Sequence, residues 1–132
     1  MDSPSSPVPV DPEIIEMLDS LQEPGEPDLI VELVTLFLRD TPERLRDLRD
    51  QPLEAALAAR VAHAVKGSAG NLGASLLQER ASELEQAGHR GESPAALAVL
   101  SDAVYAEFAR VERHLLALVA ERTGADAPVR PS

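Results

Sequence analysis

Apolar residues recur at helical spacing along most of this chain, and short segments rich in proline or glycine separate the runs. Proline suits the first position of a helix, directly after a capping residue. That pattern predicts helix starts at Pro12, Pro27, Pro52 and Pro94, in the stretches DPEIIEMLDSL, EPDLIVELV, QPLEAALAARV and SPAALAVLSDAV. A fifth helix is expected from Ser75, because Ser75 and Gln78 have the spacing of a capping box.

One short and four long amphipathic segments predict an all-α fold. We expect an antiparallel, up-down four-helix bundle with a short N-terminal capping helix that acts as a lid. Pro42 is expected to kink or interrupt the second helix, and the fourth is expected to end at Gly88 or Gly91. The folded domain is predicted to span residues 11–123. Residues 1–10 and 124–132 have the composition of disordered tails.

The composition excludes several classes of function. Aromatic residues make up only 2% of the chain, and cysteine is absent, so neither a disulfide framework nor thiolate chemistry is possible. The net charge of −11 argues against binding to nucleic acid or to an anionic membrane. No apolar run reaches the roughly 20 residues of a membrane span, and the first residues lack the features of a signal peptide. We therefore expect a cytoplasmic protein.

The third predicted helix carries a histidine that faces away from its apolar stripe. At about 100° per residue, and with His63 at zero, the stripe lies between roughly 120° and 200°. It consists of Leu57, Val61, Val65, Ser68 and Leu72. The outward face within about 40° of His63 carries only small residues, namely Ala56, Ala59, Gly67 and Gly70. Arg60 and Lys66 flank the histidine at about 60° on either side, and Lys66 is the only lysine in the chain.

The two outward-facing glycines, Gly67 and Gly70, weaken the helix without contributing to its apolar face. Each glycine inside a helix costs about 0.5–1 kcal/mol relative to alanine. Helical side chains lean toward the N-terminus, so a side chain at position 67 would lie across the ring of His63. We interpret Gly67 as steric clearance, and Lys66 as a cation that reaches toward whatever the ring binds. The plain alternative is an ordinary surface histidine beside tolerated glycines, but this combination of residues disfavours it.

The stretch AHAVKGSAGNLGA resembles the signature of the histidine-containing phosphotransfer (HPt) domain: a histidine, two residues, Lys-Gly-Ser, and then Leu-Gly. The flanking stretches LVTLFLRDTPERLRDL and LLQERASELEQAGHRG are similar to the neighbouring helices of that family. The resemblance covers roughly residues 12 to 120.

The resemblance implies that His63 accepts a phosphoryl group from the aspartyl phosphate of a receiver domain, or from a kinase, and passes it to another receiver. It implies that Lys66 stabilises the phosphoryl charge and that Gly67 provides steric clearance. The expected partners are response-regulator receiver domains, a hybrid sensor histidine kinase, or both, with Ala56, Ala59, Arg60 and Gly70 forming the docking surface. No metal or cofactor is expected on this chain, because the family's Mg²⁺ sits on the receiver.

Such a protein is a monomeric phosphocarrier rather than a true enzyme. No autokinase activity is expected, because the chain has no glycine-rich nucleotide loop. The remaining histidines receive ordinary interpretations: His89, for example, ends a helix, where a partly cationic ring complements the helix dipole. A carboxylate-bridged metal site is disfavoured, because the chain has no Glu-x-x-His pair.

Two alternatives remain open from the sequence. The first is a helical module that docks receiver domains without accepting phosphate, since a face of small residues serves docking equally well. The second is the phosphate-accepting domain of a chemotaxis-type kinase, which shares the chemistry but has a different donor. In that case the Ser/Pro-rich ends are linkers of a larger protein, although the initial methionine favours a complete chain.

Overall fold

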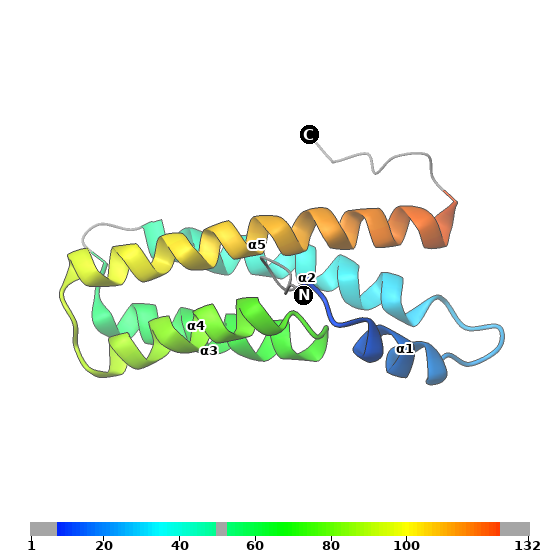
Figure 1. Ribbon diagram of the computed structural model, residues 1–132, viewed down its shortest axis with the longest axis horizontal. Helices are drawn as coiled ribbons and strands as arrows, with labels where there is room; N and C mark the ends of the chain where they lie inside the picture. The colour runs from blue at the N-terminus through cyan, green and yellow to red at the C-terminus, as the bar shows by residue number, and fades with distance from the viewer. Residues whose placement is uncertain (1–7, 50–52, 125–132) are drawn as a thin grey trace, which may run out of the picture.

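The computed structural model describes residues 8–49 and 53–124, and all the regular structure in these ranges is helical. The elements in chain order are α1 (Pro12–Ser20), α2 (Leu29–Arg46), the short 3₁₀ helix η1 (Asp47–Arg49), α3 (Ala55–Asn71), α4 (Ser75–His89) and α5 (Pro94–Thr123). From α2 onward, consecutive α-helices run in alternating directions (Figure 1). Helix α3 packs against α2 and α4, and α5 closes the bundle against the same two helices. The predicted helical bundle is confirmed.

The core lies on the axis between these four helices, where apolar side chains from each helix are almost fully buried. Examples are Ile30 and Leu45 of α2, Val65 of α3, Leu77 and Leu84 of α4, and Leu97 and Leu115 of α5. Val10 is also buried, so the packed part of the chain begins before residue 11. Of the two predicted tails, residues 1–7 and 125–132 lie outside the described residues.

Two of the predicted helix starts are confirmed. Helices α1 and α5 begin at Pro12 and Pro94, after the capping residues Asp11 and Ser93. Helix α2 begins instead at Leu29, because the side chain of Asp28 caps it. The expected start at Pro27 is therefore wrong: this proline precedes the cap.

The predicted start of α3 is also wrong, whereas α4 begins at Ser75 as expected but without the predicted capping box. Pro52 lies outside the described residues, and α3 begins only at Ala55. The capping box fails because Ser75 is already helical and the capping position is held by Ala74, which makes no side-chain bond. A tight turn explains this arrangement: Gly73 has a φ of +73°, and the N–H of Ala74 donates back to the carbonyl of Ala69 at 2.9 Å.

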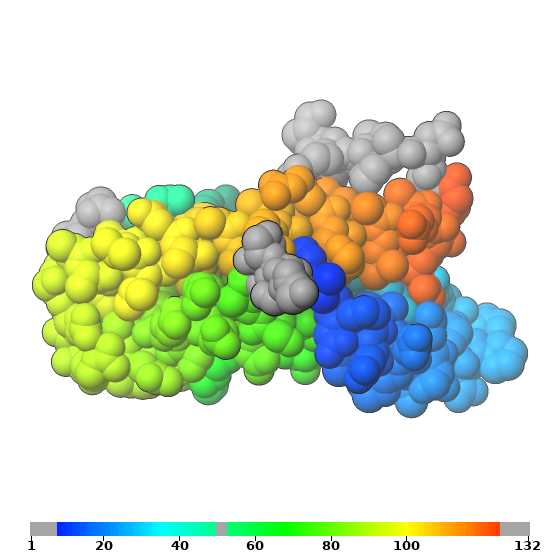
Figure 2. Space-filling model, in the orientation of Figure 1, coloured from blue at the N-terminus to red at the C-terminus, as the bar shows by residue number. Residues whose placement is uncertain are grey.

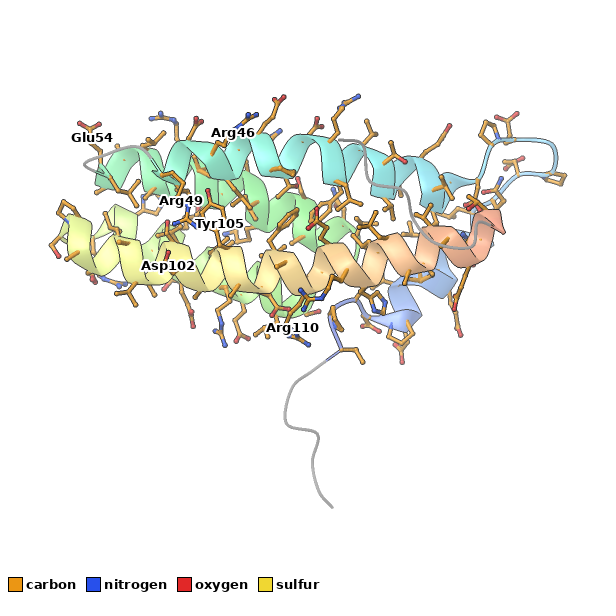
Figure 3. The ribbon with its side chains drawn as sticks, turned by 90° about the horizontal axis from the view of Figure 1, so that it is seen from above. Arg46, Arg49, Glu54, Asp102, Tyr105 and Arg110 are labelled. Atoms are coloured by element: carbon orange, nitrogen blue, oxygen red, sulfur yellow. The ribbon has the colours of Figure 1, made fainter. Side chains whose placement is uncertain are left out.

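Helix α2 continues without interruption through Pro42, and α4 ends at His89, between the two glycines expected at its end. The C-terminal end of α2 is fastened to α5. The hydroxyl of Tyr105 donates to the carbonyl of Leu45, and the guanidinium of Arg49 lies 3.8 Å from the centre of the tyrosine ring. Arg49 also reaches Asp102 at 3.4 Å, and Figure 3 shows this group between α5 and the α2–η1 segment.

The short helix α1 covers one end of the α3–α4 hairpin, as expected for a lid. The N–H of Asp11 donates to the carbonyl of Gly73 at 2.9 Å, and Ile14 packs directly over that glycine. Figure 2 shows α1, in dark blue, against the green end of the hairpin and below the C-terminal half of α5. Within the described residues, no helix is both long and apolar enough to cross a membrane.

A three-way ion pair ties α1 to the bundle. Arg122, near the end of α5, reaches Asp19 of α1 at 2.6 Å and the capping residue Asp28 at 3.0 Å. Asp28 also accepts the N–H groups of Ile30 and Val31. The hydrogen bond from Arg122 is the main cause that holds the pKa of Asp28 below its usual range.

We expect Asp28→Ala to lower the free energy of unfolding by about 1–2 kcal/mol, because it removes both the helix cap and the ion pair. Asp28→Asn keeps a capping oxygen and should cost at most about 1 kcal/mol. The native carboxyl has a lowered pKa, so its charge stabilises the fold above the unfolded value of about 3.9 and ceases to do so as pH falls through the native value. Urea unfolding at pH 7 and pH 3 measures both effects. Equal losses for the two variants, or a difference that does not change with pH, would contradict this account.

Candidate phosphoacceptor site

Helix α3 presents His63 to solvent, as the sequence predicts. The side chain of His63 is 71% exposed. A Cβ built on Gly67, one turn later, would meet no atom within 4 Å apart from its chain neighbours and the backbone of its own helix, so the space above this part of the helix is open. The opposite face of α3 is buried as expected at Val61, Val65 and Leu72.

The centre of the buried face of α3 differs from the prediction. Leu57 and Ser68 are only half-buried, whereas three alanines, Ala58, Ala62 and Ala69, are fully buried. The core face is rotated toward these alanines because α4, the closest neighbour of α3, packs on that side.

A carboxylate from α4 joins the histidine and the lysine. One carboxylate oxygen of Glu85 lies 2.7 Å from Nδ1 of His63, and the other lies 2.6 Å from Nζ of Lys66. The side chain of Glu85 is only 11% exposed. The sequence analysis missed this residue, although a signal was present: Glu85 lies four residues after Ala81, at the edge of the apolar stripe of α4, where a charged side chain needs a partner.

The contacts of Glu85 fix the chemical state of the site. The hydrogen bond from Lys66, reinforced by the one from His63, lowers the pKa of Glu85 despite its burial, so the carboxyl is ionised at neutral pH. An ionised carboxylate only accepts hydrogen bonds, and the hydrogen between the two groups therefore belongs to Nδ1 of His63. In the neutral ring this leaves Nε2 with a free lone pair.

Lys66 lies closer to the protein than the sequence predicts. Its ammonium was expected to point toward the group bound to the ring, but in the structure it is held by Glu85 and the side chain is 33% exposed. An ammonium has three N–H donors, so the contact with Glu85 leaves others for a ligand.

A close approach between α3 and α4 places Glu85 against α3. A Cβ built on Gly88, three residues after Glu85, would lie 2.7 Å from the carbonyl oxygen of Ala55 and 3.0 Å from the Cβ of Ala59. Only glycine allows the two backbones to approach this closely. Ala59 is consequently just 6% exposed, so the expectation that it lies on the open face is wrong.

The other predicted docking residues differ in their exposure. Ala56 and Arg60 are exposed. Gly70 is half-buried, because the side chain of Gln78 covers it. A Cβ built on Gly70 would lie 2.8 Å from the amide nitrogen of Gln78. His89, which received only a helix-end interpretation, lies beside the site: its Nε2 is 3.6 Å from the Glu85 oxygen that binds His63.

Comparison with known proteins identifies the class. The family model described as the Hpt domain matches residues 32–121. The chain therefore belongs to the Hpt family, whose members carry phosphoryl groups on a histidine in phosphorelays and interact there with receiver domains or kinases. Among the described residues, no group of three or more histidine, aspartate or glutamate side chains is arranged to hold a metal ion.

Two solved structures share the fold. The histidine-containing phosphotransfer protein B (HptB) of Pseudomonas aeruginosa PAO1 is 34% identical, with a TM-score of 0.72, and the match covers 90% of this chain and 98% of that one. A rice protein described as a histidine-containing phosphotransfer protein is 21% identical, with a TM-score of 0.74, and the match covers 89% and 85% of the two chains. At this identity the rice protein bears on the fold alone. A search of curated proteins finds no match.

The open space above Gly67 leads to a prediction that separates stability from transfer. Gly67→Ala should stabilise α3 by about 0.5–1 kcal/mol, because the added methyl group meets no atom within 4 Å. Gly67→Leu should fold equally well, but its side chain leans over His63. It should slow transfer at least about tenfold, because it keeps the phosphoryl donor from the position needed for attack by the ring. Thermal unfolding and phosphoryl-transfer rates measure the two effects. A leucine variant that transfers at the wild-type rate would contradict the role of Gly67 in clearance.

Proposed function

We propose that His63 is the phosphoacceptor of this phosphotransfer protein. The observation that carries the proposal is the exposed ring whose Nδ1 donates to the buried carboxylate of Glu85. This bond leaves Nε2 as the nucleophilic atom on the open side of α3.

In the proposed step, the lone pair of Nε2 attacks the phosphorus of an aspartyl phosphate on a receiver domain. An N–P bond forms, the P–O bond to the aspartate breaks, and the aspartate carboxylate leaves with the electron pair. Nδ1 keeps its hydrogen, so positive charge develops on the ring as the bond forms. Glu85, hydrogen-bonded to Nδ1 at 2.7 Å, stabilises that charge, and transfer to the next receiver reverses the same step.

Lys66 supplies the positive charge that the phosphoryl oxygens require. Its Nζ is held at 2.6 Å from Glu85, one helical turn from His63, and its remaining donors are available to the phosphoryl group. Gly67 leaves the line of approach open. Ala56, Arg60 and Gly70 belong to the surface that the partner covers, whereas the buried Ala59 supports it from below.

The proposed partners are receiver domains of response regulators, a hybrid sensor kinase, or both. We further propose that Mg²⁺ binds to the receiver and that this chain carries no cofactor. The protein is proposed to act as a monomeric phosphocarrier without autokinase activity. A cytoplasmic location accords with these partners. A module that only docks receivers would not require the Lys66–Glu85–His63 contacts, and these contacts favour phosphoryl transfer.

The test is to incubate the protein with a panel of phosphorylated receiver domains and, separately, with the ATP-binding domain of a chemotaxis-type kinase. We expect rapid labelling from at least one receiver. The label should be labile in acid and stable in alkali, and peptide mapping should place it on His63. Binding to receivers without any labelling would support the docking module instead, and labelling by the kinase domain alone would support the kinase-domain alternative.

A further inference from the structure

A hollow opens beside His63, between the N-terminal half of α3 and the C-terminal end of α4. Its volume is about 750 Å³. Its floor consists of small residues, Ala55, Ala59 and Gly88, which are the residues of the close contact between the two helices. Because these residues have little or no side chain, this part of the lining is small and apolar.

The exposed residue of fixed charge in the lining of the hollow is a cation, Arg60, although the chain as a whole is acidic. The protein has a net charge of −11, yet the exposed ionisable side chains that line the hollow are Arg60, His63 and His89. The single acidic residue in the lining, Glu85, is 11% exposed and already bound to Lys66 and His63. Arg60 forms no ion pair with any residue that the structure describes. The hollow therefore offers an incoming group a guanidinium that no described carboxylate pairs with, and the imidazole of His89, whose Nε2 lies 3.6 Å from Glu85.

Any protein that delivers a phosphoryl group to Nε2 of His63 must cover this part of α3, because the hollow begins at the histidine itself. The lining favours a particular contact. A carboxylate would lie between Arg60 of α3 and His89 of α4, and an adjacent apolar side chain would cover the alanine and glycine floor.

We infer that this hollow is a specificity subsite that receives an acidic residue, together with a neighbouring apolar residue, from the receiver domain. The inference rests on the proposed function, since it assigns part of the surface by which the donor or acceptor is recognised. Arg60 and His89 bind the carboxylate, and Ala56, exposed at the edge of the hollow, limits the size of the apolar side chain. Receivers with a basic residue at the matching position are disfavoured by repulsion.

Three variants test the subsite, with the receiver that transfers fastest to the wild-type protein as the probe. Arg60→Glu reverses the charge, His89→Gln removes the imidazole, and Ala56→Trp fills the hollow from an exposed position. Arg113→Glu is the matched control, because Arg113 is an exposed arginine on α5 that forms no ion pair with a described residue. Circular dichroism and thermal unfolding show whether each variant is folded.

We expect Arg60→Glu to raise KM for the phosphorylated receiver by about tenfold or more while kcat stays within about twofold, since a charge at the edge of an interface acts mainly on association. Ala56→Trp should raise KM similarly, His89→Gln by a smaller factor, and Arg113→Glu by less than about twofold. Labelling by the small donor phosphoramidate, which needs no docking surface, should fall far less than transfer from the receiver. A receiver whose acidic residue is changed to arginine should recover transfer to Arg60→Glu.

An unchanged KM in Arg60→Glu and Ala56→Trp, or an equal rise in Arg113→Glu, would overturn the subsite. A fall in kcat alone would also do so, because it would place Arg60 in the chemical step. These outcomes are distinct from failure of the proposed function, in which the wild-type protein would take no label on His63 from any donor.

Discussion

Replacing His63 with glutamine is expected to reduce phosphoryl acceptance to background. The amide nitrogen of glutamine has no lone pair available for attack on phosphorus, so the nucleophile is lost rather than weakened. The fold should be unaffected, because the histidine side chain is 71% exposed and substitutions at such positions usually change stability by no more than about 0.5 kcal/mol. Transfer from the preferred phosphorylated receiver, followed as label on the protein, measures the effect.

Two further measurements make this prediction specific. His114→Gln is the matched control, because it removes another exposed histidine, on α5, and should leave transfer unchanged. The His63→Gln variant should still bind the receiver, since the docking surface around the ring stays intact. Label that persists in His63→Gln, or that disappears in His114→Gln, would move the phosphoacceptor to another residue.

The helical fold was predictable because apolar residues recur at helical spacing along each segment, and in α5 this spacing also indicates the buried face. The apolar residues Leu97, Val104 and Leu115 recur at helical spacing along α5, and all three are buried in the structure. Helix starts were predicted less well, because a proline allows a helix to begin but does not require it. Asp28 accepts two hydrogen bonds from the first turn of α2, and this outweighs the preference for a start at Pro27.

The part of the site that lies on α3 was predictable for a similar reason. His63, Lys66 and Gly67 lie within two turns of one helix, so their relative positions follow from helix geometry alone. The contribution of α4 depends on how deeply two helices interlock, which a single helical wheel does not contain. The contact of Gly88 with Ala55 and Ala59 determines that depth.

That same contact explains why Ala59 was misplaced. On the wheel, Ala59 lies on the side of His63, and without knowledge of α4 it counts as exposed. The backbone of Gly88 then covers it. A glycine and alanines at facing positions of consecutive helices indicate such a close approach. This close approach also predicts that Glu85 lies beside His63.

Two substitutions at Glu85 separate the effect of its charge from that of its hydrogen bond. Glu85→Gln keeps an oxygen that accepts from Nδ1 of His63 but removes the negative charge, and we expect transfer to slow by about tenfold. Glu85→Ala removes both, and the loss should reach about 10²-fold, because the ring is then free to place its hydrogen on Nε2. Single-turnover transfer rates from a phosphorylated receiver measure both variants.

The nitrogen chemical shifts of His63 provide a readout that a purely structural role would not affect. In the wild-type protein and in Glu85→Gln, the neutral ring should carry its hydrogen on Nδ1, whereas in Glu85→Ala the two tautomers should be mixed.

The stability of the wild-type protein should also depend on pH with a definite sign. Because Lys66 and His63 lower the pKa of Glu85, its charge stabilises the fold above the unfolded value of about 4.3. This contribution is lost as pH falls through the native value.

Lys66→Met completes the test by removing the other partner of Glu85. If the charge of the carboxylate acts through both neighbours, the effects of Glu85→Gln and Lys66→Met on stability should not add, and the double variant should differ from the sum by about 0.5–3 kcal/mol. Additive effects, together with wild-type transfer rates in both Glu85 variants, would reduce Glu85 to a packing residue. The reactivity of His63 would then depend on α3 alone, and the close contact between α3 and α4 would have no part in it.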